Sequence, residues 1–394
     1  MRIGIDGACL ANRRGFGRFA RLLLAALAEA PSSHEFLVFV DRPSLDSVQV
    51  PQRFATCVVD VHEAPSRAAS ASGRRSVRDL LAMGRAVARS RLDLMFFPAS
   101  YSYFPVWSVP KVVVTMHDTL ALAHPEWVFP TWRGRLAWKL KEYAAARQAD
   151  RILTVSETAK RDILDWFGLP AGWVCVATEG PDAVFRPMEP GPESEEIVRR
   201  YGITPGSRYL LYVGGLSPHK NLPRLIEAFA QAAHADVKLV IVGDFGDVFH
   251  THVPELRAAV AKLQLESRVL FTGYVPDDEL AFLYSMAYAL VQPSLMEGFG
   301  LPPVEAMACG TPVVCSTAGS LPEVVGNAGL FFEPTDVQSI AEALRQILEQ
   351  PELRERLARL ALERAKRYTW SASAEAVLAC FDEVDPLRSL RRSA

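Results

Sequence analysis

Short apolar runs alternate with longer helical patterns along the whole chain, and this alternation restricts the fold more than any other feature. We expect strands in the first half at residues 3–5, 36–39, 94–97, 112–116 and 152–155. We expect strands in the second half at residues 210–213, 238–242, 269–271, 289–291 and 312–315. Helical patterns lie between them, for example at residues 19–30, 135–149 and 222–233. Strands and helices in this order form parallel sheets covered by helices, so the sequence predicts an α/β protein with two doubly wound, Rossmann-like domains.

A proline-rich segment at residues 185–194 divides the two halves. It contains three prolines and one glycine in ten residues, which is typical of a linker. A chain of 394 residues is also long enough for two domains. We therefore expect a first domain at residues 1–186 and a second at residues 197–370.

The composition is that of a globular protein, with 49% apolar and 22% charged residues. No apolar run reaches the roughly 18 residues that span a bilayer, and the N-terminus lacks the apolar core of a secretory signal, so we expect a cytoplasmic protein. The six cysteines form no CxxC pair, which favours reduced thiols over a zinc site. Residues 1–180 hold 23 Lys and Arg against 17 Asp and Glu, whereas residues 181–394 hold 20 against 28. Either an anionic partner of the first half or chance accounts for this imbalance.

The most informative segment follows the expected strand at residues 289–291. Gly298 and Gly300 let the backbone approach a ligand closely, and the two prolines that follow suit the start of a helix. A glycine turn before a helix directs peptide N–H groups at an anion such as a diphosphate. Glu297 and Glu305 flank the turn and can accept hydrogen bonds from sugar and ribose hydroxyls. The alternative for Glu305 is that it only complements the helix dipole.

A second segment repeats this arrangement after the strand at residues 210–213. Gly214 and Gly215 leave room for a ligand, and Lys220 adds a positive charge just before a helix. These residues can bind phosphate, although the segment lacks the core of a Walker loop. The alternative is that Lys220 is a solvated surface residue.

Two features of the first half also lie next to strands. Gly15 and Gly17 follow the first strand, and a tight turn is the alternative to a ligand-binding loop there. His117 follows the strand at residues 112–116, at the edge where ligands bind in open α/β sheets. A structural histidine is the alternative.

Together these segments resemble the retaining glycosyltransferases of family 4, which have the GT-B fold of two Rossmann-like domains facing across a cleft. The resemblance covers nearly the whole chain. It rests on the Gly-Phe-Gly-Arg loop at residues 15–18, on His117-Asp118, on Gly214-Gly215 with Lys220-Asn221, and on Glu297 and Glu305, which match the family's E-x7-E signature.

The resemblance implies roles for individual residues. Glu297 would contact the donor sugar, Lys220 would hold the diphosphate, and Glu305 would bind the ribose hydroxyls. Gly17 and His117 would approach the donor from the first domain. The remaining implied donor-binding residues are Gly215, Gly298, Phe299, Gly300 and Leu301 around the diphosphate, and Tyr274 and Val275 beside the nucleobase.

The resemblance also implies the chemistry. It predicts transfer of a hexose without metal or cofactor, the nucleotide-sugar being a substrate, with GDP-mannose favoured over a UDP-sugar. The acceptor would be a saccharide or lipid-linked saccharide in cell-surface polysaccharide or glycolipid assembly. The alternatives are another GT-B enzyme, such as a nucleotide-sugar epimerase or a phosphorylase, and a non-catalytic sugar-nucleotide-binding subunit. A dehydrogenase would need a dinucleotide fingerprint that the chain lacks.

Two further expectations come with the family. Many relatives carry an Arg shortly before the phosphate-binding Lys, where this chain has Gly215 and His219. A protonated His219 or Arg224 could supply the second positive charge. The family architecture also implies that a C-terminal helix at about residues 371–386 returns to the first domain.

Aromatic and basic residues interleave at residues 127–141. Trp suits the headgroup region of a membrane, and Lys and Arg suit anionic lipid. Arg74, Arg75 and Arg78 would add to the same positive field. We therefore expect peripheral contact with an anionic membrane, unless Trp132 and Trp138 are buried against the sheet.

Overall fold

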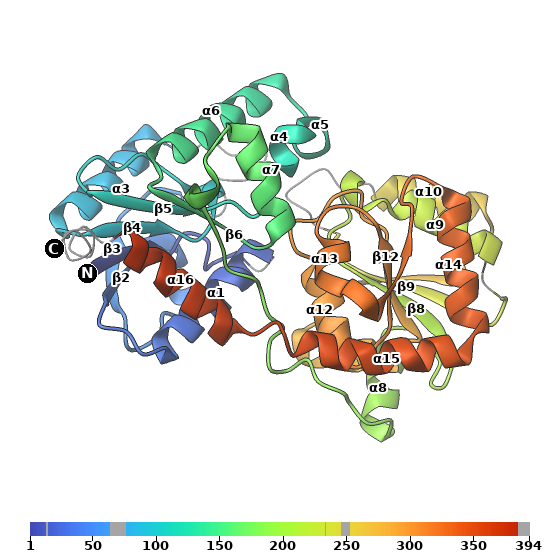
Figure 1. The fold of residues 1–394 in the computed structure, drawn as a ribbon. Coiled ribbons are helices and arrows are strands. Elements are labelled where there is room, and N and C mark those ends of the chain that lie inside the picture. Colours follow the sequence, from blue (N-terminus) through green and yellow to red (C-terminus); the bar gives the residue numbers. More distant parts are fainter. Residues whose placement is uncertain (13–14, 64–75, 233, 246–252, 385–394) are drawn as a thin grey trace. The chain divides into compact units, whose positions relative to one another are not determined.

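The computed structural model describes residues 1–12, 15–63, 76–232, 234–245 and 253–384 (Figure 1). The chain divides into two compact units, Met1–Glu179 together with the segment that begins at Trp370, and Gly180–Thr369. The first change of unit therefore falls before residue 186, where the sequence predicted the end of the first domain. Arg74, Arg75 and the chain after residue 384 lie outside the described residues.

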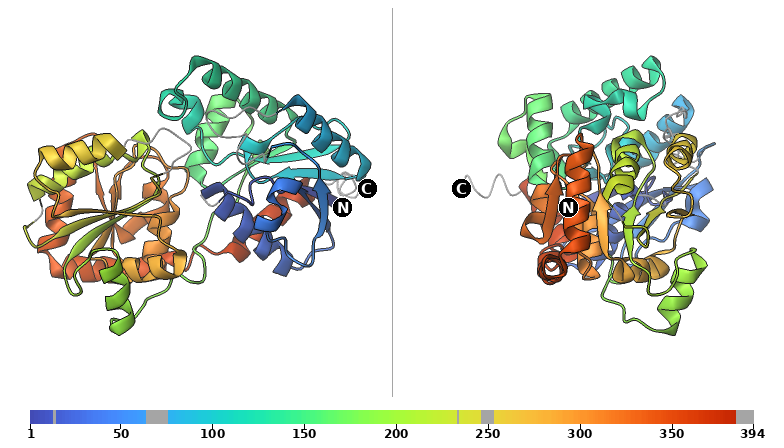
Figure 2. Two further views of the ribbon diagram at one scale, coloured as in Figure 1. Left: turned by 180° about the vertical axis from the view of Figure 1, so that it is seen from behind. Right: turned by 90° about the vertical axis from the view of Figure 1, so that its right-hand side faces the viewer.

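The first unit contains a seven-stranded parallel sheet with the order β3-β2-β1-β4-β5-β6-β7. The strands are β1 (Arg2–Asp6), β2 (Glu35–Asp41), β3 (Ala55–Val59), β4 (Leu94–Phe97), β5 (Lys111–Thr115), β6 (Arg151–Thr154) and β7 (Val174–Val176). The central strands are almost continuously apolar because helices cover both faces of the sheet (Figures 1 and 2). The edge strands β3 and β7 were not predicted from the sequence, because β3 is mostly exposed and β7 has only three residues.

The helices of the first unit come from both ends of the chain. They are α1 (Gly15–Glu29), α3 (Val77–Arg89), α4 (Leu120–Ala123), α5 (Pro125–Val128), α6 (Trp132–Gln148), α7 (Glu157–Phe167) and α16 (Trp370–Glu383). Helix α16 lies beside α1 and contacts β6 and β7 (Figure 1). Its Phe381 ring packs 5.2 Å from that of Phe96 in β4, so the last helix forms part of the core of this unit.

The second unit contains a six-stranded parallel sheet with the order β10-β9-β8-β11-β12-β13. The strands are β8 (Tyr209–Val213), β9 (Lys238–Val242), β10 (Val269–Gly273), β11 (Ala289–Gln292), β12 (Val313–Ser316) and β13 (Gly329–Phe332). The helices are α8 (Pro192–Arg200), α9 (Leu222–Ala232), α10 (Val253–Lys262), α11 (Asp277–Met286), α12 (Leu301–Ala308), α13 (Leu321–Val325), α14 (Val337–Glu349) and α15 (Pro351–Ala365). Both units thus have the predicted doubly wound architecture.

The predicted linker is shorter than its proline content suggested. Helix α8 begins at Pro192, a residue that suits the first helical position because its missing N–H would have no helical partner. Ser194 Oγ accepts a hydrogen bond from the Gly191 N–H at 2.9 Å and so caps the helix start. The prediction that the second domain starts at residue 197 therefore placed its boundary inside a helix. No helix in the described ranges is long and apolar enough to cross a membrane.

Candidate functional site

Two loops of the second unit meet where the order of its strands reverses. One loop, residues 214–221, follows β8 and leads to α9; the other, residues 293–300, follows β11 and leads to α12. Strands β8 and β11 are neighbours in the sheet, but their helices turn away toward opposite edges. A crevice at the carboxyl ends of such strands is the usual ligand site of an open α/β sheet. We call these two segments the switch-point loops.

Lys220 and Glu297 join the two switch-point loops. The Lys220 ammonium donates a hydrogen bond to Glu297 Oε1 at 2.6 Å. The same oxygen accepts hydrogen bonds from Ser294 Oγ at 2.7 Å and Gln292 Nε2 at 2.9 Å. The side chains of Lys220 and Glu297 are only 17% and 12% exposed. The structure thus brings together the two residues that the sequence placed in separate motifs.

The surroundings of Lys220 shift the pKa values of Glu297 and His219. Burial raises the pKa of Glu297, but the Lys220 charge and the hydrogen bonds from Lys220 and Ser294 outweigh burial and hold the pKa below its usual value. Burial and the Lys220 charge lower the pKa of His219 to about 3. Near neutral pH Glu297 is therefore ionised and His219 is neutral. The suggestion that a protonated His219 supplies a second positive charge is wrong.

Arg224 does not join this group either. Its guanidinium donates a hydrogen bond to Asn221 Oδ1 at 2.9 Å. Asn221 is buried, has a left-handed backbone (φ 58°), and donates through its amide to the carbonyl oxygens of Pro293 at 3.0 Å and Pro334 at 2.7 Å. Asn221 therefore ties the first switch-point loop to the second. Its position next to Lys220 was visible in the sequence, but its partners were not.

Residues that follow β12 support the glycine turn before α12 through hydrogen bonds and close packing. Gly300 caps α12 with a positive φ of 102°, as a glycine at this turn can. The Ser320 N–H donates to the Glu297 carbonyl at 3.1 Å, and Ser320 Oγ donates to the Phe299 carbonyl at 2.8 Å. A Cβ added to Gly319 would lie 2.5 Å from the same Glu297 carbonyl oxygen. The backbone of Glu297 is thus fixed by contacts that no single motif contains.

The start of α12 has fewer N–H donors than an ordinary helix. Leu301 is its first residue, and Pro302 and Pro303 follow, so two positions of the first turn lack an N–H. The N–H groups of this turn that precede the two prolines belong to Phe299, Gly300 and Leu301. Gly298, Phe299 and Gly300 are buried, and the Phe299 ring packs edge-on against Tyr368 at 5.4 Å.

The other candidate residues of this unit lie in different environments. Gly215 follows β8, and its carbonyl accepts a hydrogen bond from the Tyr212 hydroxyl at 2.6 Å. Glu305 is 1% exposed, and its Oε2 accepts a hydrogen bond from the Tyr284 hydroxyl at 2.9 Å. The carboxylate of Glu305 thus lies beneath the surface, and its contact with ribose stays a prediction.

The two residues expected at the nucleobase follow β10. The Tyr274 side chain is 60% exposed, whereas Val275 is 2% exposed and belongs to the core. Tyr274 can therefore offer a ring to a ligand, while Val275 can offer its backbone. Both roles stay predictions.

His117 and Gly17 belong to the first unit. His117 lies after β5, and its Nε2 is 3.2 Å from the Pro98 carbonyl oxygen while its Nδ1 is 3.5 Å from Glu179 Oε1. The ring packs on Phe16 and Phe19 at 4.8 and 4.6 Å. Both ring nitrogens of His117 thus have protein neighbours. A Cβ on Gly17 would lie 1.7 Å from the Asn12 carbonyl oxygen, so a glycine is required there.

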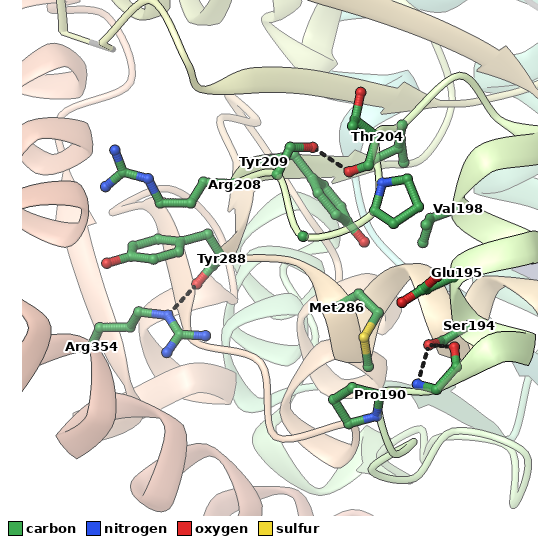
Figure 3. Close-up of a pocket in the computed structure, with 15 residues that line it drawn as sticks. Pro190, Ser194, Glu195, Val198, Thr204, Arg208, Tyr209, Met286, Tyr288 and Arg354 are labelled. Carbon is green, nitrogen blue, oxygen red and sulfur yellow. Dashed lines mark hydrogen bonds between the residues drawn. The ribbon is translucent and has the colours of Figure 1, made fainter.

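A cavity of about 370 Å³ lies at the amino ends of the central strands of the second sheet (Figure 3). Its lining includes Arg208 and Tyr209 at the start of β8 and Tyr288 just before β11. The guanidinium groups of Arg208 and Arg354 lie 5.9 and 4.5 Å from the centre of the Tyr288 ring. This cavity is therefore separate from the switch-point loops, which follow the carboxyl ends of the strands.

Comparison with solved structures places this architecture in a known class. Sucrose-phosphate synthase from Thermosynechococcus elongatus aligns with a TM-score of 0.77 and 21% identity over 100% of both chains. HepE from Anabaena, solved in complex with UDP-glucose, aligns with a TM-score of 0.72 and 21% identity over 98% of this chain and 100% of that chain. These similarities confirm the predicted GT-B fold.

Sequence comparison then gives the family. Residues 13–183 match the family described as Glycosyltransferase Family 4, and residues 193–364 match Glycosyl transferases group 1. The chain is 34% identical to the O-antigen chain mannosyltransferase B of Escherichia coli over 66% of this chain and 67% of that protein. It is 29% identical to the serotype-specific mannosyltransferase WbdA of Escherichia coli over 70% of this chain, a match that spans 34% of WbdA. This chain belongs to the family 4, group 1 glycosyltransferases.

Proposed function

We propose that this glycosyltransferase is a retaining, metal-independent hexosyltransferase that uses a nucleotide-diphosphate sugar. The observation that supports it most is the meeting of Lys220, ionised Glu297 and the glycine turn at the switch point. Negative charge builds up on the diphosphate when its bond to the sugar breaks, and positive groups placed there lower the barrier. In this proposal Lys220 and the N–H groups of Phe299, Gly300 and Leu301 hold the diphosphate.

Glu297 has the properties of an orienting group rather than a base. Its Oε1 already accepts three hydrogen bonds, and these stabilise its ionised form. We propose that its carboxylate accepts hydrogen bonds from hydroxyl groups of the donor sugar. In a front-face retaining reaction the departing phosphate oxygen can take the acceptor's proton, so the reaction needs no carboxylate pair of the kind that glycosidases use.

The proposed donor is GDP-mannose, with a UDP-sugar as the other candidate. Similarity to mannosyltransferase B and WbdA of Escherichia coli supports mannose as the sugar. The proposed acceptor is a saccharide or lipid-linked saccharide in cell-surface polysaccharide or glycolipid assembly at the cytoplasmic face of a membrane. The D-inositol 3-phosphate glycosyltransferase of Kineococcus radiotolerans is 30% identical over 73% of this chain and 69% of that protein. Its name gives a second acceptor class to test.

The test is release of nucleoside diphosphate from GDP-mannose, UDP-glucose and UDP-N-acetylglucosamine, with mannosyl oligosaccharides or inositol phosphate as acceptors. We expect release that depends on an acceptor, persists in EDTA, and gives a product whose anomeric configuration by NMR matches the donor. An inverted product would contradict retention. Activity that EDTA removes and magnesium or manganese restores would contradict metal independence, and epimerised donor without transfer would contradict the function itself.

A further inference from the structure

Helix α6 presents four large apolar side chains to solvent. Trp132 is 67% exposed, Leu136 48%, Leu140 63% and Tyr143 43%. Steps of four, four and three residues place these side chains along one stripe of the helix. An apolar stripe on a surface helix normally faces the protein core, so this one requires another explanation.

The core contact of α6 is made by a different face. Ala145 and Ala146 are buried in the core beneath the helix, and Glu142 is buried beside them. Trp138 is half-buried, with its ring 5.2 Å from that of Phe129 and the Lys141 ammonium 3.5 Å from its ring centre. The sequence left open whether Trp132 and Trp138 are both buried. The structure packs Trp138 against the protein and exposes Trp132.

The charges on α6 that reach the surface are all positive. They belong to Arg133, Lys139 and Arg147, whereas Arg135 and Lys141 are half-buried and the one carboxylate of the helix, Glu142, is 4% exposed. Arg133 and Lys139 flank the apolar stripe. Their charged groups lie 5.5 Å from the ring centre of Trp132 and 5.9 Å from that of Tyr143, respectively. The stripe is thus apolar along its centre and cationic at its sides.

A further exposed ring lies close to the C-terminal end of α6. Trp107 is 87% exposed. Its neighbour Val106 exchanges two hydrogen bonds with the Gln148 amide, at 3.1 and 2.7 Å. Trp107 is therefore anchored beside the last turn of the helix without being covered by it.

We propose that the α6 face, formed by Trp132, Arg133, Leu136, Lys139, Leu140 and Tyr143, docks on the anionic leaflet of a lipid bilayer. The helix would lie parallel to the membrane, with the two leucines at the acyl boundary, the aromatic rings among the headgroups, and the cations on lipid phosphates. The charge of the α6 face favours lipid over a second copy of the chain as its binding partner, because α6 exposes no carboxylate with which a second α6 could pair. Docking would bring the enzyme to the membrane that holds the proposed lipid-linked acceptor, so its purpose rests on the proposed function. Docking itself can be measured without donor or acceptor.

The test is co-sedimentation of the full chain with phosphatidylglycerol–phosphatidylcholine vesicles and with pure phosphatidylcholine vesicles. We expect binding to the anionic vesicles at low salt, and weaker binding at high salt because salt screens the cations. The double variant Arg133→Glu with Lys139→Glu should lower the partition coefficient by about 30-fold or more. That change corresponds to about 1 kcal/mol for each cation near an anionic leaflet.

Two further variants make the result specific. Trp132→Ser with Leu140→Ser should weaken binding without changing the melting temperature, because both side chains are exposed. Arg356→Glu with Arg359→Glu, which changes the charge equally on exposed positions of α15, should bind as the parent does.

Equal binding by the α6 and α15 charge variants would overturn the proposal, as would a protein that stays in the supernatant with anionic vesicles. A concentration-dependent dimer that Trp132→Ser dissociates would assign the face to self-association instead. Nucleotide release by the α6 variants with a soluble acceptor should stay at the parental rate, which separates failure here from failure of the proposed function.

Discussion

At the scale of single residues, the ion pair between Lys220 and Glu297 is the centre of the proposed site. The two charged groups lie 2.6 Å apart, largely out of water, and Lys220 stabilises the ionised form of Glu297. In the proposed site, the diphosphate would give Lys220 a second anionic partner, and sugar hydroxyls would give Glu297 further hydrogen-bond donors. Substitutions of Lys220 and of Glu297 therefore test the two proposed roles separately.

Replacing Lys220 by Ala should raise the dissociation constant of the nucleoside diphosphate about 10- to 150-fold. A hydrogen bond to a charged group contributes about 1.5–3 kcal/mol, and this substitution removes one. Isothermal titration calorimetry measures the change. Lys262→Ala, at an exposed position of α10, is the matched control and should bind normally. An unchanged constant for Lys220→Ala would remove the lysine from the phosphate site.

Replacing Glu297 by Gln should lower sugar transfer about 100-fold, the upper end of what one charge-assisted hydrogen bond contributes. The amide keeps the size of the side chain but loses its negative charge. Circular dichroism should show an intact fold, and Glu266→Gln, at an exposed position, should retain full activity. Transfer within twofold of the parent enzyme would exclude Glu297 from the site.

His219 should make the free energy of unfolding depend on pH. Its pKa is about 3 in the folded protein and about 6.5 in an unfolded chain. Between these values the unfolded chain binds a proton that the folded protein does not, so stability falls as the pH is lowered from about 6.5 toward 3. His219→Gln should lose less stability than the parent over this range in urea unfolding experiments. Parallel curves for the two proteins would show that His219 titrates normally.

At the scale of elements, the loop after β12 supports the second switch-point loop, residues 293–300. Gly319 has a φ of 59° and packs directly on the Glu297 carbonyl oxygen, and Ser320 adds three hydrogen bonds to the same turn. The position of the Glu297 side chain thus depends on a neighbouring element that touches no ligand in the proposed site.

Gly319→Ala tests this support against a matched glycine. Gly206 also has a positive φ, 77°, but a Cβ there would meet no atom within 4 Å. Gly206→Ala should cost about 1–2 kcal/mol for the backbone conformation alone, whereas Gly319→Ala should cost about 1–3 kcal/mol more because of the clash. Denaturant unfolding measures both. Only Gly319→Ala should also reduce sugar transfer, and equal activity of the two variants would refute the support role.

At the scale of the whole molecule, the chain builds one unit from both of its ends. Helix α16 packs on α1 and buries Phe381 against Phe96. The first unit therefore includes a segment that follows the second unit in the chain. The predicted return of a helix at about residues 371–386 corresponds to α16, Trp370–Glu383.

Phe381→Ala should therefore destabilise the first unit and leave nucleotide binding intact. Truncating a buried Phe costs about 3–5 kcal/mol, and Phe381 is 0% exposed. Unfolding should begin at lower denaturant, whereas the dissociation constant of the nucleoside diphosphate should stay within about threefold, because Lys220 and Glu297 lie in the other unit. A tenfold loss of affinity under native conditions would contradict this separation.

The sequence by itself determined the features that depend on neighbouring residues. Alternating strands and helices predicted two parallel sheets, and the glycines and prolines at residues 298–303 predicted a turn that opens a helix, because backbone conformation follows local residue type. Three edge strands escaped this reasoning: β3 and β13 each have only one fully buried residue, and β7 is too short to show a period.

Only the tertiary structure decided which distant groups meet. It brought Lys220 to Glu297, 77 residues away, placed Asn221 against Pro293 and Pro334, and left His219 without the proton that would have made it a second cation. It also exposed Trp132 while packing Trp138 against Phe129. Burial and the partners of a charge are set by which loops the sheet topology places side by side, and neither can be read from the spacing of residues along the chain.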